Sequence, residues 1–125
     1  MRNFRELQVW QKARALALDV YTITKNFPTD ECFGLTNQTR RAVISIASNI
    51  SEGAGRNSDR DLARYLSIAA GSANELECQI ILASDFEYLP EVDAKRIEES
   101  IQEIRKMLHG FIRSLTLEAG SQGSG

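Results

Sequence analysis

Apolar residues recur at intervals of three and four along most of the chain, the spacing that places them on one face of a helix. This pattern predicts four amphipathic helices over residues 6–25, 36–54, 59–88 and 91–117. The inward-facing residues expected from it are, in chain order, Val9, Ala13, Leu16, Val20, Ile23, Thr39, Val43, Ile46, Ala47, Ile50, Leu62, Tyr65, Leu66, Ala69, Ala73, Leu76, Ile80, Ala83, Ile97, Ile101, Ile104, Leu108, Phe111, Ile112 and Leu115.

Local signals predict where these helices begin and end. The Phe-Pro pair at 27–28 and the Leu-Pro pair at 89–90 end the first and third helices, because proline cannot continue a helix. Thr36 and Ser58 are the expected N-caps of the second and third helices, since a hydroxyl accepts a free backbone N–H. The glycines within 53–55 are expected to end the second helix, with left-handed geometry at its C-terminus.

The sequence therefore predicts an all-α protein. Four helices with short connections favour an antiparallel up-down-up-down four-helix bundle. The length of 125 residues suits one domain, which we expect over 1–119, followed by a flexible Gly/Ser-rich tail over 120–125.

Composition adds few chemical candidates. His109 has no Glu or His on its helix face, and Cys32 and Cys78 lack the spacing of a zinc site, so we expect no metal and no cofactor. The two cysteines are expected to serve as small apolar residues. No nucleophile and base share a pattern, so the protein is predicted not to be an enzyme; a buried pair of carboxylates with raised pKa values would revive that possibility. No secretory signal or membrane span is visible, which favours the cytoplasm.

Charge is distributed unevenly although the net charge is only −2. Residues 1–64 carry ten Lys/Arg and seven Asp/Glu, whereas residues 65–125 carry five and ten. The chain has no overall basic excess of the kind that nucleic-acid-binding domains show.

The outer faces of the second and third helices carry residues that are unusual on a solvated helix. Ser, Gly and Asn are poorer helix formers than the Lys, Glu and Gln typical of such a face. The residues concerned are Arg41, Ser45, Ser48 and Glu52 on the second helix and Ser67, Gly71, Asn74 and Cys78 on the third, flanked by Ile68, Ile81 and Leu82. This pattern predicts a second packing surface, most simply between subunits, which we favour. The alternatives are that the face packs within the monomer or that these residues are simply tolerated on the surface.

One concentration of basic residues remains. Arg56, Arg60 and Arg64 surround the turn between the second and third helices, and Arg40 precedes it. Arginines near a helix N-terminus suit contacts with phosphate, which makes these four residues candidates for RNA or DNA binding. Acidic residues in the same turn leave a simpler alternative, namely solvated loop arginines.

A long ordered set of residues also matches a known family. The matching positions over 4–117 are Phe4, Leu7, Val9, Trp10, Ala13, Phe27, Pro28, Glu31, Gly34, Leu35, Gln38, Arg40, Arg41, Ala42, Ser45, Ile46, Asn49, Ile50, Glu52, Gly53, Gly71, Ser72, Glu75, Leu76 and Gln79. On these residues the chain resembles the bacterial four-helix-bundle proteins encoded in intervening sequences of 23S rRNA genes. It departs from the family's usual residues at Phe33, Ala47 and Ser51, where Tyr, Pro and Ala are common.

The resemblance implies a homopentameric ring without known catalytic activity. It also implies kinship to the accessory proteins of diversity-generating retroelements, which form similar rings and bind nucleic acid and reverse transcriptase through a basic surface. The matching polar residues fall largely on the second packing surface, so we assign them to assembly: Arg41, Ser45, Asn49, Glu52, Gly71 and Glu75. The leading hypothesis is a non-enzymatic oligomeric scaffold or binding module that contacts itself and another protein. The alternative is an RNA- or DNA-binding ring.

Overall fold

The computed structural model describes the backbone of residues 2–123 and the side chains as far as Leu117. It contains four α-helices, α1 (Gln8–Thr24), α2 (Leu35–Ala54), α3 (Asp59–Asp85) and α4 (Glu91–Gly123). Two short 3₁₀-helices, η1 (Phe4–Glu6) and η2 (Thr29–Glu31), precede α1 and α2. No strand occurs within residues 2–123, so the predicted all-α class is confirmed.

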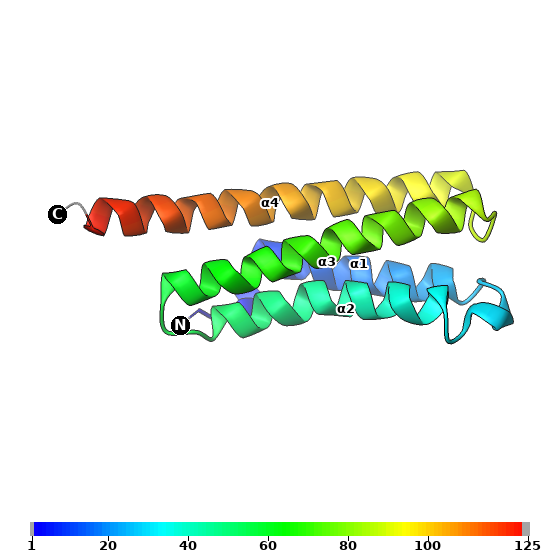
Figure 1. Cartoon of the computed structure of the whole chain (residues 1–125), viewed down its shortest axis with the longest axis horizontal. Coiled ribbons are helices and arrows are strands. Elements are labelled where there is room, and N and C mark those ends of the chain that lie inside the picture. The colour runs from blue at the N-terminus through cyan, green and yellow to red at the C-terminus, as the bar shows by residue number, and fades with distance from the viewer. Residues whose placement is uncertain (1, 124–125) are drawn as a thin grey trace.

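The four helices lie side by side along one long axis (Figure 1). α2 packs against α3, α3 packs against α4, and α1 contacts both α2 and α4. The α1–α2 and α3–α4 connections lie at one end of the molecule, and the α2–α3 connection lies at the other (Figure 1). The N-terminal segment joins this second end, where the Arg2 backbone N–H donates to the Ala54 carbonyl at 2.8 Å.

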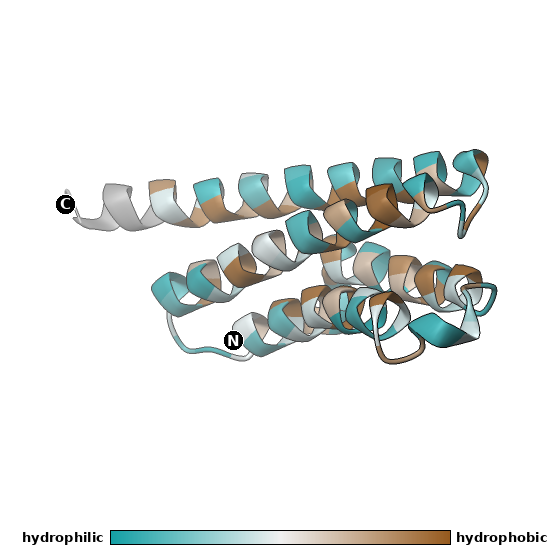
Figure 2. Ribbon diagram, turned by 45° about the vertical axis from the view of Figure 1, so that its right-hand side comes forward, coloured by the Kyte–Doolittle hydropathy of each residue, from teal (hydrophilic) through white to brown (hydrophobic). Residues whose placement is uncertain are grey.

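The core is formed by the apolar stripes that the sequence predicts. The hydrophobic faces of the helices turn toward the middle of the bundle (Figure 2). All of the predicted inward residues are buried except four that are only partly buried, namely Ala47, Tyr65, Phe111 and Ile112. Phe27 and Leu89, placed in the sequence analysis at helix ends, are buried at the end that holds the α1–α2 and α3–α4 connections.

The predicted helix ends hold only in part. Ser58 caps α3 as expected, because its Oγ accepts the Asp61 N–H at 3.1 Å. The prediction for Thr36 is wrong, because α2 begins at Leu35 after Gly34 and Thr36 is buried in the first turn. Gly55 follows α2, but its φ of −83° is right-handed, so the predicted left-handed cap is also wrong.

Three helices end elsewhere than predicted. α1 ends at Thr24, before the Phe-Pro pair, and α3 ends at Asp85, three residues earlier than expected. α4 continues beyond 117 to Gly123, which includes part of the segment expected to be a flexible tail. The rest of that segment, Ser124 and Gly125, lies outside the described residues, and the flexibility of the tail stays a prediction.

A specific hydrogen-bond motif ends α3. The Tyr88 N–H donates to the Ala83 carbonyl at 2.9 Å, and the Glu87 N–H donates to the Ser84 carbonyl at 3.0 Å. This pair of bonds is the Schellman motif, in which the residue after the C-cap is left-handed and is usually glycine. Glu87 occupies that position with φ of 64°. Because these two hydrogen bonds end α3 at Asp85, the helix stops before the Leu-Pro pair at 89–90.

Gly53 allows α2 to lie close to α3. A Cβ at this position would lie 2.8 Å from the Tyr65 Cβ and 3.0 Å from the Leu62 Cδ1. The first of these is shorter than Cβ contacts in real structures, so a side chain here would force the two helices apart. We therefore interpret Gly53 as a packing residue inside α2 rather than as its end.

Gly53→Ala should destabilise the protein by about 1–3 kcal/mol, the usual cost of overpacking, although alanine favours helix over glycine. Urea unfolding followed by circular dichroism measures this change. Gly110→Ala is the matched control, since a Cβ on Gly110 in α4 meets nothing within 4 Å. We expect the control to stabilise the protein by roughly 0.5–1 kcal/mol. Equal stabilisation by both variants would contradict the close approach at Gly53.

Glu87→Gly should stabilise the protein by roughly 0.5–1 kcal/mol. Left-handed backbone costs a residue with a Cβ about 1–2 kcal/mol, so glycine removes this cost. The greater conformational freedom of glycine in the unfolded chain offsets part of the stabilisation. Glu87→Ala removes the same charge and keeps the strain, so it should bring no such gain. Thermal unfolding of the two variants distinguishes them, and an equal rise in Tm would mean that charge and not backbone geometry is responsible.

Candidate assembly face and arginine cluster

The residues predicted to mediate assembly lie mostly on the surface of α2 and α3, which we call the α2–α3 face. Eight of them are exposed, and Ser45 and Asn49 are partly buried. The exposed ones are Arg41, Ser48, Glu52, Ser67, Gly71, Asn74, Glu75 and Cys78. The face also carries apolar side chains that the core does not cover, since Ile44, Ile68 and Leu82 are all exposed.

A short polar seam joins the two helices beneath this face. The Ser45 and Ser72 hydroxyl oxygens lie 2.7 Å apart and share a hydrogen bond. Asn49 Nδ2 donates to the Ser45 carbonyl at 2.8 Å and to the Ser45 Oγ at 3.0 Å. The small serine side chains allow α2 and α3 to stay close, and they also fix the register between the helices.

The same register places two buried polar side chains, those of Thr39 and Gln79, near each other along the α2–α3 contact. Thr39 and Gln79 are buried, and neither the Thr39 Oγ1 nor the Gln79 Oε1 has a hydrogen-bond partner among the described residues. Gln79 Nε2 donates to the Glu75 Oε1 at 3.3 Å, which orients that carboxylate on the α2–α3 face.

Asn74 differs from the other assembly candidates because it contacts α4. Its Oδ1 accepts a hydrogen bond from Arg105 Nη1 at 2.9 Å, and the same guanidinium pairs with Glu77 at 3.2 Å. Asn74 is therefore used to join α3 to α4 within the monomer. Ile81 also lies on this side of α3, in a groove between α3 and α4.

Gly71 stands at the centre of the exposed part of α3. A Cβ at this position would meet no atom within 4 Å, in contrast with Gly53. Glycine in a helix interior costs roughly 0.5–1 kcal/mol relative to alanine. No contact among the described residues explains this glycine.

Two of the candidate nucleic-acid residues contact the ring of one tyrosine. The guanidiniums of Arg56 and Arg64 lie 4.8 and 4.6 Å from the centre of the Tyr65 ring. Arg56 also donates to the Tyr65 hydroxyl and to Glu52 Oε1, both at 2.6 Å, and Arg64 lies 3.7 Å from Asp61. The charges of both arginines are thus partly balanced within the chain.

Arg60 differs from its neighbours, because it is exposed and has no ion-pair partner in the described part of the chain. Arg40 lies far from this cluster, about 24 Å from Arg56 by helix rise. Its Nε donates to the Thr24 Oγ1 at 2.8 Å, and its guanidinium lies over the Tyr21 ring at 4.5 Å. The structure brings Arg56, Arg60 and Arg64 together and uses Arg40 to join α1 to α2.

The residues considered for other chemistry are all exposed. Cys32 and Cys78 lie on the surface, which corrects the expectation that they serve as small apolar packing residues. His109 is exposed on α4. Within residues 2–117, no group of three or more His, Cys, Asp or Glu side chains is placed to hold a metal ion. No helix in the described chain is long and apolar enough to span a membrane.

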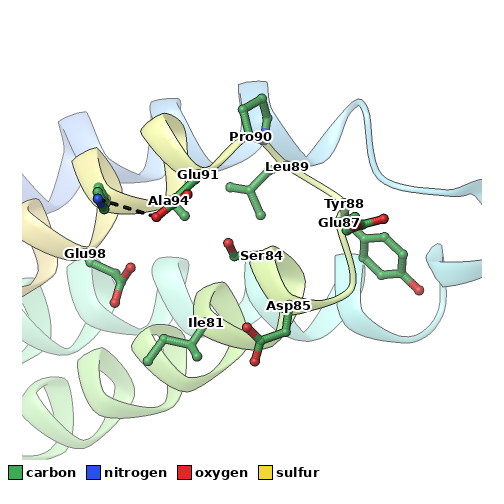
Figure 3. A pocket seen from close by; sticks show the side chains of 11 residues that line it. Ile81, Ser84, Asp85, Glu87, Tyr88, Leu89, Pro90, Glu91, Ala94 and Glu98 are labelled. Carbon is green, nitrogen blue, oxygen red and sulfur yellow. Dashed lines mark ion pairs between the residues drawn. The ribbon is translucent and has the colours of Figure 1, made fainter.

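One surface feature is not predicted by the sequence pattern. A groove of about 960 Å³ opens between the end of α3 and the start of α4, where Asp85, Glu87, Glu91 and Glu98 surround apolar residues (Figure 3). The negative charge of residues 65–125 is the sequence signal that accompanies it. The groove itself depends on two helices and cannot be identified from either segment alone.

Comparison with known proteins agrees with the resemblance seen in the sequence. The family model described as 23S rRNA-intervening sequence protein matches residues 5–110. The chain is similar to a crystal structure of a protein of unknown function from the S23 ribosomal protein family of Bacteroides thetaiotaomicron. The two share 28% sequence identity with a TM-score of 0.78, over 83% of this chain and 97% of the other. The search of curated proteins gave no match. The chain belongs to the family of 23S rRNA-intervening sequence proteins.

Proposed function

We propose that the protein is a non-enzymatic scaffold or binding module of the cytoplasm, built as an antiparallel up-down-up-down bundle that assembles with copies of itself. The α2–α3 face is the subunit interface in this proposal. A homopentameric ring is the stoichiometry that the family resemblance implies. The absence of catalysis is included because the resemblance implies no catalytic activity.

The main support for the proposal is the empty space around Gly71. A glycine that weakens a long helix, although a Cβ there would meet no atom within 4 Å, is explained if a second backbone or side chain approaches it closely in the assembly. Burial of the neighbouring Ile44, Ile68 and Leu82 would supply favourable apolar contact to the same interface.

Charge on the α2–α3 face supports the same interface. Arg41 and Glu75 lie at similar levels of adjacent helices, yet neither has an ion-pair partner in the described part of the chain. Glu52, in contrast, is already paired with Arg56. Arg41 of one copy and Glu75 of the next are therefore the proposed intersubunit pair.

Gly71→Leu should lower the mass of the assembly to that of a monomer or smaller oligomer, because the leucine side chain occupies the space that the neighbouring copy needs. Sedimentation velocity measures the mass, and circular dichroism should show unchanged helix content. Gly110→Leu provides the matched control, since Gly110 is also an exposed helical glycine with nothing within 4 Å of a Cβ. An unchanged mass for Gly71→Leu, or equal dissociation of both variants, would contradict the interface.

A second candidate function is RNA or DNA binding through the cluster around Arg60. The exposed, unpaired guanidinium of Arg60 lies in the first turn of α3, where backbone N–H groups favour an anion. Repetition of the cluster around a ring would strengthen weak phosphate contacts through multivalency.

Fluorescence anisotropy with a labelled RNA hairpin and a DNA duplex tests this second function. If about three phosphates are contacted, affinity should fall roughly 40-fold between 50 and 200 mM salt. Arg60→Ala with Arg64→Ala should weaken binding, whereas Lys25→Ala at the other end of the bundle should not. Arg56 is kept because it holds Tyr65 in place. No binding at low salt would exclude this function and leave the scaffold proposal standing.

A further inference from the structure

The groove between α3 and α4 has an apolar floor. Leu89 and Ala94 are buried there, and Ile81 is partly open to solvent beside them. Figure 3 shows these side chains between the last turns of α3 and the first turns of α4. Ser84 and Ala94, which the two helices contribute to the lining at this level, have small side chains.

The rim of the groove is acidic. Asp85, Glu87, Glu91 and Glu98 line it together with a single basic residue, Lys95. Lys95 is paired with Glu91 at 3.4 Å, and the other three carboxylates have no ion-pair partner among the described residues. Glu91 and Glu98 are seven residues apart, so they lie on one face of α4 about 10 Å apart along its axis.

The same end of the bundle exposes large apolar side chains. Phe33 is 92% exposed, Val92 is 72% exposed and Phe86 is 53% exposed. Phe86 packs against Tyr88 at 5.5 Å between ring centres, and Tyr88 packs against the buried Phe27 at 5.7 Å. Desolvation raises the pKa of Tyr88, and a hydrogen bond to Glu31 raises it further. These contacts connect the exposed Phe86 to the buried Phe27 through Tyr88.

Acidic residues predominate in the half of the molecule that contains the groove, and basic residues predominate in the other half. Residues 19–45 and 73–102 form the half that holds this end, and they contain eleven acidic and five basic side chains. Residues 2–18, 46–72 and 103–117 form the other half and contain five acidic and ten basic side chains. A positively charged partner is therefore attracted to the end that holds the groove, and a nucleic acid is repelled from it.

We propose that this groove binds a Lys/Arg-rich amphipathic helix of another protein. The apolar face of that helix lies over Ile81, Leu89 and Ala94, and its basic residues pair with Asp85, Glu87 and Glu98. The volume of about 960 Å³ lies within the range of roughly 300–1,000 Å³ found for binding pockets. Anchors spaced at three and four residues are the usual way in which a helix occupies a groove of this kind.

The site is separate from the proposed assembly face. Ile81 lies on the side of α3 that faces α4, whereas Gly71 and Leu82 belong to the α2–α3 face. The groove therefore remains open in an assembly formed through that face, and loss of one function is distinguishable from loss of the other.

A designed peptide tests the proposal on the full-length protein. The probe is a labelled helix of about 18 residues with leucines at helical spacing on one face and lysines elsewhere. A second peptide carries glutamates in place of the lysines. Fluorescence anisotropy at about 150 mM salt should show saturable binding of the lysine peptide, with Kd in the micromolar range, and none of the glutamate peptide.

Variants of the groove make the test specific. Asp85→Asn with Glu98→Gln should weaken binding of the lysine peptide roughly tenfold, as expected for the loss of two ion pairs. Ile81→Ser should also weaken it, because part of the affinity comes from the apolar floor. Glu6→Gln with Glu99→Gln is the control with the same net charge, since both residues are exposed and lie outside the groove.

Three results would overturn the proposal. The first is no binding of the lysine peptide to the wild-type protein, and the second is equal weakening by the groove variant and the charge-matched control. The third is a lower oligomer mass for the groove variant in sedimentation velocity, which would mean that a second copy of the chain occupies the groove. Loss of peptide binding at unchanged mass is the result expected.

Discussion

The close contact between α2 and α3 is the constraint on which the rest of the structure depends. Gly53 removes the side chain that would separate the helices, and the Ser45–Ser72 hydrogen bond fixes their register. Tyr65, whose Cβ lies against Gly53, is also the residue whose ring contacts the guanidiniums of Arg56 and Arg64. The close contact between α2 and α3 and the arginine cluster therefore share one residue.

Much of the fold follows from the sequence because burial has a helical period. The stripe on α3 from Leu62 to Ile80 is predictable from spacing alone, and Ser58 caps the helix through a local contact three residues away. Helix ends are harder to predict when they depend on tertiary packing. Thr36 has a side chain suited to an N-cap, but it is buried inside the first turn of α2. α3 ends early because Glu87 adopts a left-handed backbone conformation.

The candidate surfaces are predictable as residue types but not as partnerships. The basic character of Arg40 is plain in the sequence, yet its contacts with Tyr21 and Thr24 join positions 19 and 16 residues away. The bond between Asn74 and Arg105 spans 31 residues and turns a presumed assembly residue toward α4. Contacts of this length depend on helix register, which hydrophobic periodicity does not specify.

Association through the α2–α3 face, as proposed, would strengthen binding at the groove. If copies associate through the α2–α3 face around an axis parallel to the helices, every groove lies on the same side of the ring, and every arginine cluster lies on the opposite side. Each groove alone offers three unpaired carboxylates and a short apolar floor, which is a modest site. Several grooves on one side raise the effective concentration of a partner that has repeated basic helices or is itself oligomeric. Assembly through the α2–α3 face would thereby raise the overall affinity for such a partner above the affinity of a single groove.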